Sequence, residues 1–260
     1  CKRMKHLFSL TLLIFLSFFI KQPAEAPLLA NSWQQLTLGE QAITNGPLIL
    51  VNQQHAWHEE PTELLNIGEQ LDGLINHGKE VVVDKSIVSP LLQMLSDAKA
   101  AGFHRLNITS TYRRPEIQKQ LYQEFGKDYA LPPNHSEHQT GLAVDISLVS
   151  GKMEGTDEAN WLAEHAPNYG FIVRYPQNKT DITGIAYEPW HFRYVGLPHS
   201  LIMQQKDFVL EEYLTFLQQA KTFIYEANHV HYVIDYVETT QLEQPFTYPW
   251  YVEFQYSGNN

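Results

Sequence analysis

Residues 141–148 alternate between two kinds of side chain, with the two-residue period of a β-strand. One face carries apolar residues, at Leu142, Val144, Ile146 and Leu148. The other face carries Gly141, Ala143, Asp145 and Ser147. The pattern predicts a strand that packs one face on a core and leaves Asp145 in an open cleft. Because a buried, unpaired carboxylate is costly, Asp145 needs a cationic partner there.

Similar patterns predict the other elements. Alternation or a short apolar run predicts strands at 48–52, 106–112 and 170–175. Helical spacing predicts helices at 90–101, 115–125, 157–166 and 200–220, the last interrupted near Asp207. The first helix is expected to begin with Ser89 as its N-cap and Pro90 at its first position, and Gly102 is expected to close it.

The helix at 115–125 has two faces of interest. Its apolar residues Ile117, Leu121 and Phe125 recur at helical spacing, so we expect them to form a core stripe. Arg113 precedes the helix, and Gln118 lies about one turn into it. Free N–H groups and a guanidinium converge at this helix start, which favours an anion site. A surface salt bridge is the alternative for a lone arginine.

A proline interrupts the alternating pattern near residue 190. Beyond it, Trp190, Phe192 and Tyr194 are expected on an aromatic core face, and His191, Arg193 and Val195 on the other face. Pro189 holds Glu188 out of helical geometry. Glu188 and His191 can therefore reach the same cleft.

The N-terminal residues have the pattern of a secretory signal. Basic residues precede an apolar run at 7–20, and a small-x-small site ends at Ala26. The run is shorter than the roughly 20 residues of a membrane span, which favours cleavage after Ala26 over an uncleaved N-terminal anchor. Either alternative predicts an extracellular domain, secreted or attached to the membrane.

The remaining chain is long enough for one well-buried domain with an appendage. We expect residues 1–26 to be the signal peptide or anchor, and residues 27–47 to be a tether. The main domain would occupy residues 48–220. Alternating aromatic and β-branched residues resume after Phe223, which predicts a β-rich C-terminal extension at 221–260.

The charge and cysteine content narrow the possible partners and ligands. The formal net charge is −11, and removing four basic residues and one acidic residue with residues 1–26 would make it −14. This acidic balance disfavours nucleic acid or an anionic membrane as a partner surface. Cys1 is the only cysteine, so any metal must be held by histidine and carboxylate.

Two histidines, one aspartate and one further glutamate suffice for a catalytic zinc site. Three protein ligands leave a fourth position for water, and the metal lowers the pKa of that water from about 15.7 towards 7. Spacing alone leaves alternatives open, because the chain has 12 histidines and His135 competes with His138 for the role. Histidines that are hydrogen-bonded in a cleft without metal are the other interpretation.

Two motifs resemble those of the VanY-type D-alanyl-D-alanine carboxypeptidases, zinc peptidases of peptidoglycan in the same broad family as the L,D-carboxypeptidases of the LdcB type. They are Ser136-x-His138-x-x-Gly141-x-Ala143-x-Asp145 and Glu188-Pro189-Trp190-His191-Phe192-Arg193-Tyr194. Ser110-Thr111-Tyr112-Arg113 also resembles that family's Ser-Gly-Tyr-Arg element, with Thr111 in place of the glycine. The resemblance covers roughly residues 48–214.

The resemblance implies an α+β fold, in which a small antiparallel sheet carries a zinc cleft and is flanked by helices. It implies that zinc (Zn2+) is bound by His138, Asp145 and His191. Glu188 would be the catalytic base. The implied substrate-binding residues are Arg113, which would hold the terminal carboxylate, and Ser136 and Gln118 as helpers.

The implied activity is that of a hydrolase, a metallocarboxypeptidase that removes the C-terminal D-alanine from peptidoglycan stem peptides at the cell wall. One alternative is L,D-carboxypeptidase action on tetrapeptide stems with the same chemistry. Another is a non-catalytic peptidoglycan-binding module of the same fold. A pure binder has no need of Glu188, so the complete residue set favours an enzyme.

Overall fold

The computed structural model describes residues 13–20, 33–36, 46–61, 63–78, 80–126, 130–227, 229–238, 246–249 and 252–259. These residues belong to two compact units. One is Leu50–Phe216, and the other combines the residues up to Ile49 with those from Leu217 onwards. The predicted cleavage site after Ala26 and most of the predicted tether lie outside the described residues.

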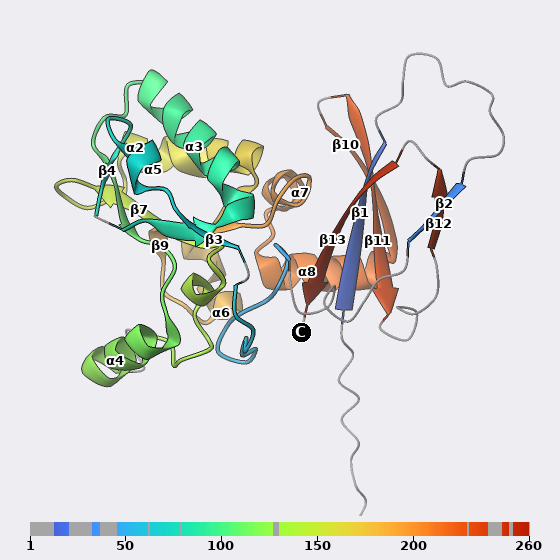
Figure 1. Cartoon of the computed structure of the whole chain (residues 1–260), viewed down its shortest axis with the longest axis horizontal. Coiled ribbons are helices and arrows are strands. Elements are labelled where there is room, and N and C mark those ends of the chain that lie inside the picture. The colour runs from blue at the N-terminus through green and yellow to red at the C-terminus, as the bar shows by residue number, and fades with distance from the viewer. Residues whose placement is uncertain are drawn as a thin grey trace, which may run out of the picture. The chain divides into compact units, whose positions relative to one another are not determined.

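The unit Leu50–Phe216 contains a five-stranded sheet with the strand order β4-β6-β7-β9-β8. Its strands β4, β7 and β9 are labelled in Figure 1. Its strands are β4 (Asn76–His77), β6 (Leu106–Ser110), β7 (Ala143–Leu148), β8 (Phe171–Tyr175) and β9 (Glu188–Tyr194). The short β4 is parallel to β6, and the other neighbours are antiparallel. A separate antiparallel pair joins β3 (Leu64–Asn66) to β5 (Val82–Asp84).

Helices pack around this sheet, so the predicted α+β fold is confirmed. The α-helices are α2 (Gly68–Leu71), α3 (Lys85–Ala100), α4 (Pro115–Phe125), α5 (Asp157–His165), α6 (Thr180–Thr183), α7 (His199–Lys206) and α8 (Leu210–Ala220). The 3-10 helices are η1 (Glu137–Thr140), η2 (Ala166–Tyr169) and η3 (Gln177–Lys179). The predicted interruption near Asp207 separates α7 from α8, where Asp207 has a φ of 51°.

The core lies on the apolar face of β7, as the alternation predicts. Leu142, Val144, Ile146 and Leu148 are all buried. They belong to one cluster with the buried face of α3, which includes Leu91, Met94 and Leu95. On the opposite face of β7, Asp145 and Ser147 stay partly exposed. The strand therefore separates a packed interior from a solvent-accessible side.

Two predictions of secondary structure are wrong, the start of one helix and the presence of one strand. Helix α3 begins at Lys85 rather than at Pro90, because the Asp84 side chain accepts a hydrogen bond from the Ser86 N–H at 2.9 Å and forms the N-cap. The buried Ile87 extends the core face ahead of the proline. Residues 48–52 do not form a strand. Their apolar side chains are buried, and a short apolar run indicates burial without deciding the backbone conformation.

The other unit is rich in β-structure. One sheet has the order β10-β11-β1-β13, and a second pair joins β12 to β2. The strands are β1 (Leu13–Ile20), β2 (Trp33–Leu36), β10 (Thr222–Ala227), β11 (Val230–Glu238), β12 (Phe246–Pro249) and β13 (Val252–Asn259). Part of the N-terminal apolar run thus forms β1. Among the described helices, none has the length and apolar character needed to cross a membrane.

Candidate metal centre and active site

The strand register and a tight turn bring three predicted ligands together. Asp145 of β7 and His191 of β9 are directly paired across the sheet. His138 comes from η1, which ends at Gly141 with a φ of 75°. A Cβ atom at Gly141 would lie 2.9 Å from the backbone nitrogen of Asp84, so this left-handed turn has no room for a side chain. The turn leads the chain directly from η1 into β7.

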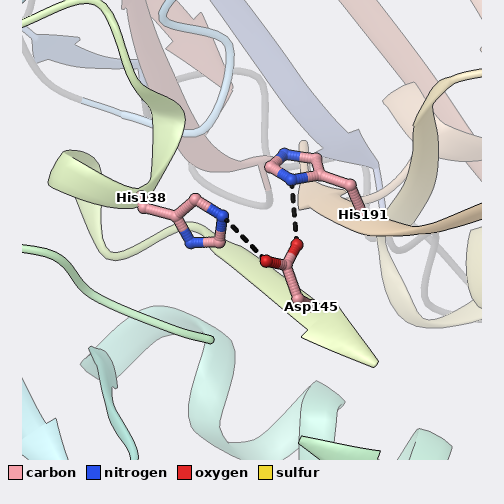
Figure 2. Close-up of side chains that lie close together, drawn as sticks. All are labelled: His138, Asp145 and His191. Atoms are coloured by element: carbon pink, nitrogen blue, oxygen red, sulfur yellow. Dashed lines mark hydrogen bonds and ion pairs between the residues drawn. The ribbon is translucent and has the colours of Figure 1, made fainter. Parts of the chain in front are cut away.

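His138, Asp145 and His191 form one convergent cluster, as Figure 2 shows. Each residue offers one ligand atom, and these atoms all lie within 4.8 Å of one another. The Nε2 atom of His138 lies 3.3 Å from Oδ2 of Asp145, and Nδ1 of His191 lies 3.0 Å from Oδ1. Within the part of the chain that the structure describes, this is the one group of three or more such residues that could hold a metal ion.

Hydrogen bonds on the far side of each ring determine which nitrogen faces the cluster. Nδ1 of His138 lies 2.8 Å from the carbonyl oxygen of Thr111, which can only accept. This nitrogen therefore carries the proton, and Nε2 is left to face Asp145. Nε2 of His191 lies 3.2 Å from Oε2 of Glu137, so its Nδ1 faces Asp145. Thr111 does not have a positive φ, so its replacement of the family's glycine is compatible with this geometry.

Glu137 belongs to the site and was not among the predicted site residues. Its side chain is fully buried and forms ion pairs with Arg174 and Arg193. Two features of the sequence could have identified Glu137, its position next to His138 in the motif and its acidic side chain. The sequence pattern there resembles a polar loop, and only the packed structure shows that the carboxylate is buried and facing His191.

The electrostatics of the cluster follow from these contacts. Burial opposes ionisation of Asp145, but His138 and His191 hold its pKa well below the usual value. Burial lowers the pKa of His138, which favours the neutral imidazole that a metal ligand requires. Burial has the same effect on His191, yet hydrogen bonds to Asp145 and Glu137 raise its pKa to about 9. A metal cation next to Nδ1 would replace the proton shared with Asp145.

All the predicted site residues line one cavity of about 760 Å³. They are Arg113, Gln118, Ser136, His138, Asp145, Glu188 and His191. Oε2 of Glu188 lies 3.8 Å from Nδ1 of His191, next to the cluster. Burial raises the pKa of Glu188 above that of an ordinary glutamate. A carboxylate with a raised pKa beside a possible metal site is suited to proton transfer.

Neighbouring side chains hold Arg113 in place. Its guanidinium donates to Oε1 of Gln118 at 2.8 Å and to Oγ of Ser110 at 2.9 Å. Gln118 is buried, and its amide nitrogen donates to the carbonyl oxygen of Leu131 at 2.6 Å. Both ends of the Gln118 amide are thus engaged within the protein. This arrangement suits Gln118 to positioning Arg113.

Two predictions of apolar packing differ from the structure. In α4, Ile117 and Phe125 are 46% and 52% exposed, and the buried residue of this helix is Gln118. Phe125 lines the cavity instead of a core. Trp190, predicted on an aromatic core face, is 38% exposed and also lines the cavity. In α4 the periodicity identifies an apolar face, part of which borders the cavity. In β9 the predicted face is divided, because Phe192 is fully buried in the core, as predicted, and Trp190 borders the cavity.

His135 and His138, the two candidates for one ligand, differ in their contacts. Nδ1 of His135 lies 2.7 Å from the carbonyl oxygen of Asn52. His135 is not a member of the cluster that could hold a metal. His138 is, because η1 turns its side chain towards β7.

Known proteins are similar to this chain in sequence and in fold. The family model VanY, D-alanyl-D-alanine carboxypeptidase, matches residues 80–197. A D-alanyl-D-alanine carboxypeptidase of Enterococcus faecium is 40% identical over 237 residues, which cover 89% of this chain and 78% of that protein. The chain belongs to the VanY family of D-alanyl-D-alanine carboxypeptidases. The resemblance seen in the sequence motifs is therefore confirmed.

Two solved structures illustrate this similarity. The LdcB LD-carboxypeptidase is 35% identical, with a TM-score of 0.57, and the match covers 64% of this chain and 84% of that chain. The D,D-pentapeptidase VanY from a VanB-type vancomycin resistance cassette, solved in complex with Zn(II), is 31% identical with a TM-score of 0.55. That match covers 65% of this chain and 98% of the other.

Proposed function

We propose that this chain is a zinc-dependent D,D-carboxypeptidase that removes the C-terminal D-alanine from peptidoglycan stem peptides. One observation carries the proposal: His138, Asp145 and His191 converge in a cavity that also contains Glu188 and Arg113. Metal ligands, a proton-transfer group and a carboxylate-binding group are the parts that a metallocarboxypeptidase requires.

The donor set fits zinc. Two imidazole nitrogens and one carboxylate oxygen are a common set for catalytic zinc, which binds such ligands at about 2.0–2.2 Å. Tetrahedral ligands at that distance lie roughly 3.3 Å apart, close to the 3.3 Å and 3.0 Å contacts of Asp145 with His138 and His191. When bound, zinc would polarise the scissile carbonyl and make a water molecule acidic enough to act as nucleophile near neutral pH.

Glu188 is proposed as the general base and acid. Its carboxylate borders the cluster, but it lies farther from Nδ1 of His191, at 3.8 Å, than the carboxylate of Asp145 does, at 3.0 Å. Glu188 is therefore available for proton transfer. Its raised pKa, caused by burial, brings it nearer to neutral pH than an exposed glutamate. It would take the proton from the attacking water and give it to the departing amine of D-alanine.

Arg113 is proposed to bind the terminal carboxylate of the substrate. A guanidinium forms two parallel hydrogen bonds with a carboxylate, and such recognition requires a fixed orientation. Ser110 and Gln118 provide that orientation through the hydrogen bonds to Arg113. Ser136, which is buried and lines the same cavity, is the proposed helper near the carboxylate.

We also propose that the enzyme acts outside the cytoplasm, secreted or attached to the membrane at the cell wall. The support is the pattern of the N-terminal residues, with basic residues before an apolar run and a small-x-small site. The substrate class is consistent with this location, since peptidoglycan stem peptides are cell-wall components.

Mass spectrometry of purified stem peptides tests the function. After incubation with the full chain, a pentapeptide stem is expected to lose one D-alanine, and removing the metal with a chelator is expected to stop the reaction. Adding zinc back to the chelated protein should restore it. Hydrolysis that continues in the chelator would contradict the zinc proposal.

The same experiment separates the alternatives. The similarity to the LdcB LD-carboxypeptidase keeps L,D-carboxypeptidase action open as the second candidate. A tetrapeptide stem incubated in parallel would be shortened by that activity, whereas a D,D-carboxypeptidase would leave it intact. Zinc binding without hydrolysis of either stem would indicate a peptidoglycan-binding module.

A further inference from the structure

Glu137 lies at the centre of a buried network of four charged side chains. Oε1 of Glu137 accepts from Nε of Arg174 at 2.8 Å and from a terminal nitrogen of Arg193 at 2.7 Å. The two terminal nitrogens of Arg174 donate to the two carboxylate oxygens of Glu211 in α8, at 2.9 Å and 2.6 Å. Two glutamates and two arginines balance in charge, which makes their burial possible.

The two oxygens of Glu137 have different partners. Oε1 is shared by the two arginines, and Oε2 lies 3.2 Å from Nε2 of His191. The arginine contacts hold the carboxylate in one orientation, with Oε2 towards the imidazole. Because an ionised carboxylate can only accept hydrogen bonds, Nε2 of His191 must carry a proton. The lone pair of this ring can then lie only on Nδ1, the atom that faces Asp145.

We propose that Glu137 is a positioning residue of the metal centre, which holds His191 in the orientation and tautomer that present Nδ1 to the metal. Arg174 and Arg193 fix Glu137, and Arg174 links it to Glu211 in α8. The inference rests on the proposed function, since it concerns a residue behind a proposed zinc ligand. It adds to the metal centre a carboxylate that contacts a proposed ligand, His191, and is not itself one of the three clustered ligands.

Glutamine is an informative replacement because it has the same shape and no charge. If its amide nitrogen faces His191, it donates to Nε2 and drives the ring proton to Nδ1, where it blocks metal binding. If its amide oxygen faces His191, its NH₂ group points at the two guanidinium groups, which are also donors. Neither orientation satisfies both sets of partners. Glu137→Gln is therefore expected to weaken zinc binding in either case.

Zinc affinity of the full chain provides a test that does not depend on activity. Competition with a chromophoric chelator would measure the Kd of wild type, Glu137→Gln and Glu158→Gln. Glu158 is the matched control, because it is also a buried glutamate paired with an arginine, Arg105, at 2.7 Å, and it does not line the cavity. Loss of a carboxylate behind a metal-binding histidine typically costs about 10- to 100-fold in metal affinity.

The expected result is a zinc Kd about 10- to 100-fold higher for Glu137→Gln and unchanged for Glu158→Gln. The visible spectrum of the cobalt-substituted protein should change in Glu137→Gln alone. If folded Glu137→Gln binds zinc as tightly as wild type, Glu137 only neutralises the arginines and the inference is wrong. Wild type that binds no zinc would instead overturn the proposed function, and this inference with it.

Glu137→Asp keeps the test decisive if the glutamine variant does not fold. It preserves the negative charge between Arg174 and Arg193 but shortens the side chain by one methylene, which withdraws the carboxylate from His191. We expect Glu137→Asp to fold and to bind zinc more weakly than wild type. Wild-type affinity in this variant would also contradict the proposed role.

Discussion

The two faces of β7 contrast packing with chemistry on a single strand. Val144 and Ile146 are fully buried in the core, while Asp145 between them faces the cavity. The core face depends on shape and volume, because many apolar contacts contribute small amounts each. The function of the cavity face depends on the position and orientation of individual polar atoms. Substitutions on the core side should therefore reduce stability, and those on the cavity side should reduce activity.

Replacing Glu188 with alanine is expected to give the largest effect on the cavity side. Loss of a general base typically lowers turnover by about 10²- to 10⁴-fold. Glu188 is not a proposed ligand, so the variant should still bind one zinc ion per chain and unfold at a similar temperature. Steady-state kinetics and metal analysis would check this. A variant with wild-type turnover would remove Glu188 from the mechanism.

On the core side, Ile146→Ala should reduce stability and leave zinc binding unchanged. Truncating a fully buried isoleucine typically costs about 2–5 kcal/mol of unfolding free energy, because a cavity remains. Urea denaturation would measure the loss. At low temperature, where the variant is still folded, its zinc content should equal that of wild type. Loss of zinc with little loss of stability would show that the two faces are not separable.

Arg113→Lys tests the cavity side more finely. Lysine keeps the charge but cannot form the paired hydrogen bonds of a guanidinium, nor the contacts to Ser110 and Gln118 together. A hydrogen bond to a charged group contributes about 1.5–3 kcal/mol, so kcat/KM should fall by about 10- to 100-fold. The effect should be absent with a substrate whose terminal carboxylate is amidated, because that substrate offers Arg113 no carboxylate.

The pH dependence of stability distinguishes a buried histidine outside the cavity, His199, from the cavity histidine His191. Burial lowers the pKa of His199 to about 3, whereas the cavity histidine His191 has its pKa raised to about 9. Below pH 6.5 the unfolded chain takes up a proton at His199 and the folded chain does not. The free energy of unfolding therefore decreases as the pH is lowered from 6.5 to about 3. Between pH 7.5 and pH 5 this amounts to about 2 kcal/mol.

The variant His199→Gln isolates that contribution. Its urea-denaturation free energy should change less than that of wild type between pH 7.5 and pH 5, with the difference close to about 2 kcal/mol. Other titrating groups affect both proteins alike and cancel in the comparison. Equal pH dependence in the two proteins would show that His199 does not carry the effect.

Local patterns in the sequence predicted the longer helices and strands of the domain, such as α3, α4 and β7. The alternation at 141–148 predicted both the strand β7 and which of its residues are buried. Helical spacing predicted a helix at 115–125, and α4 has these bounds. These features depend on near neighbours, through backbone geometry and the period of each element, and they are therefore readable from one sequence. The motifs around His138 and His191 likewise identified the candidate ligands.

Only the tertiary structure decided what each apolar face packs against. The stripe of α4 has the same helical spacing as that of α3, yet Phe125 is exposed at the cavity and Leu91 is buried in the core. Periodicity identifies an apolar face but not what covers it. The same holds for His135 and His138, three residues apart, of which only His138 faces Asp145.

Glu137 shows the physical reason most clearly. Its burial requires Arg174 and Arg193, which come from β8 and β9 and reach it only after the sheet has formed. A glutamate in a polar turn is ordinarily solvated, and no local pattern distinguishes it from one that is enclosed. The sequence thus determined which groups could hold a metal. The pairing of distant strands decided which carboxylate lies against His191.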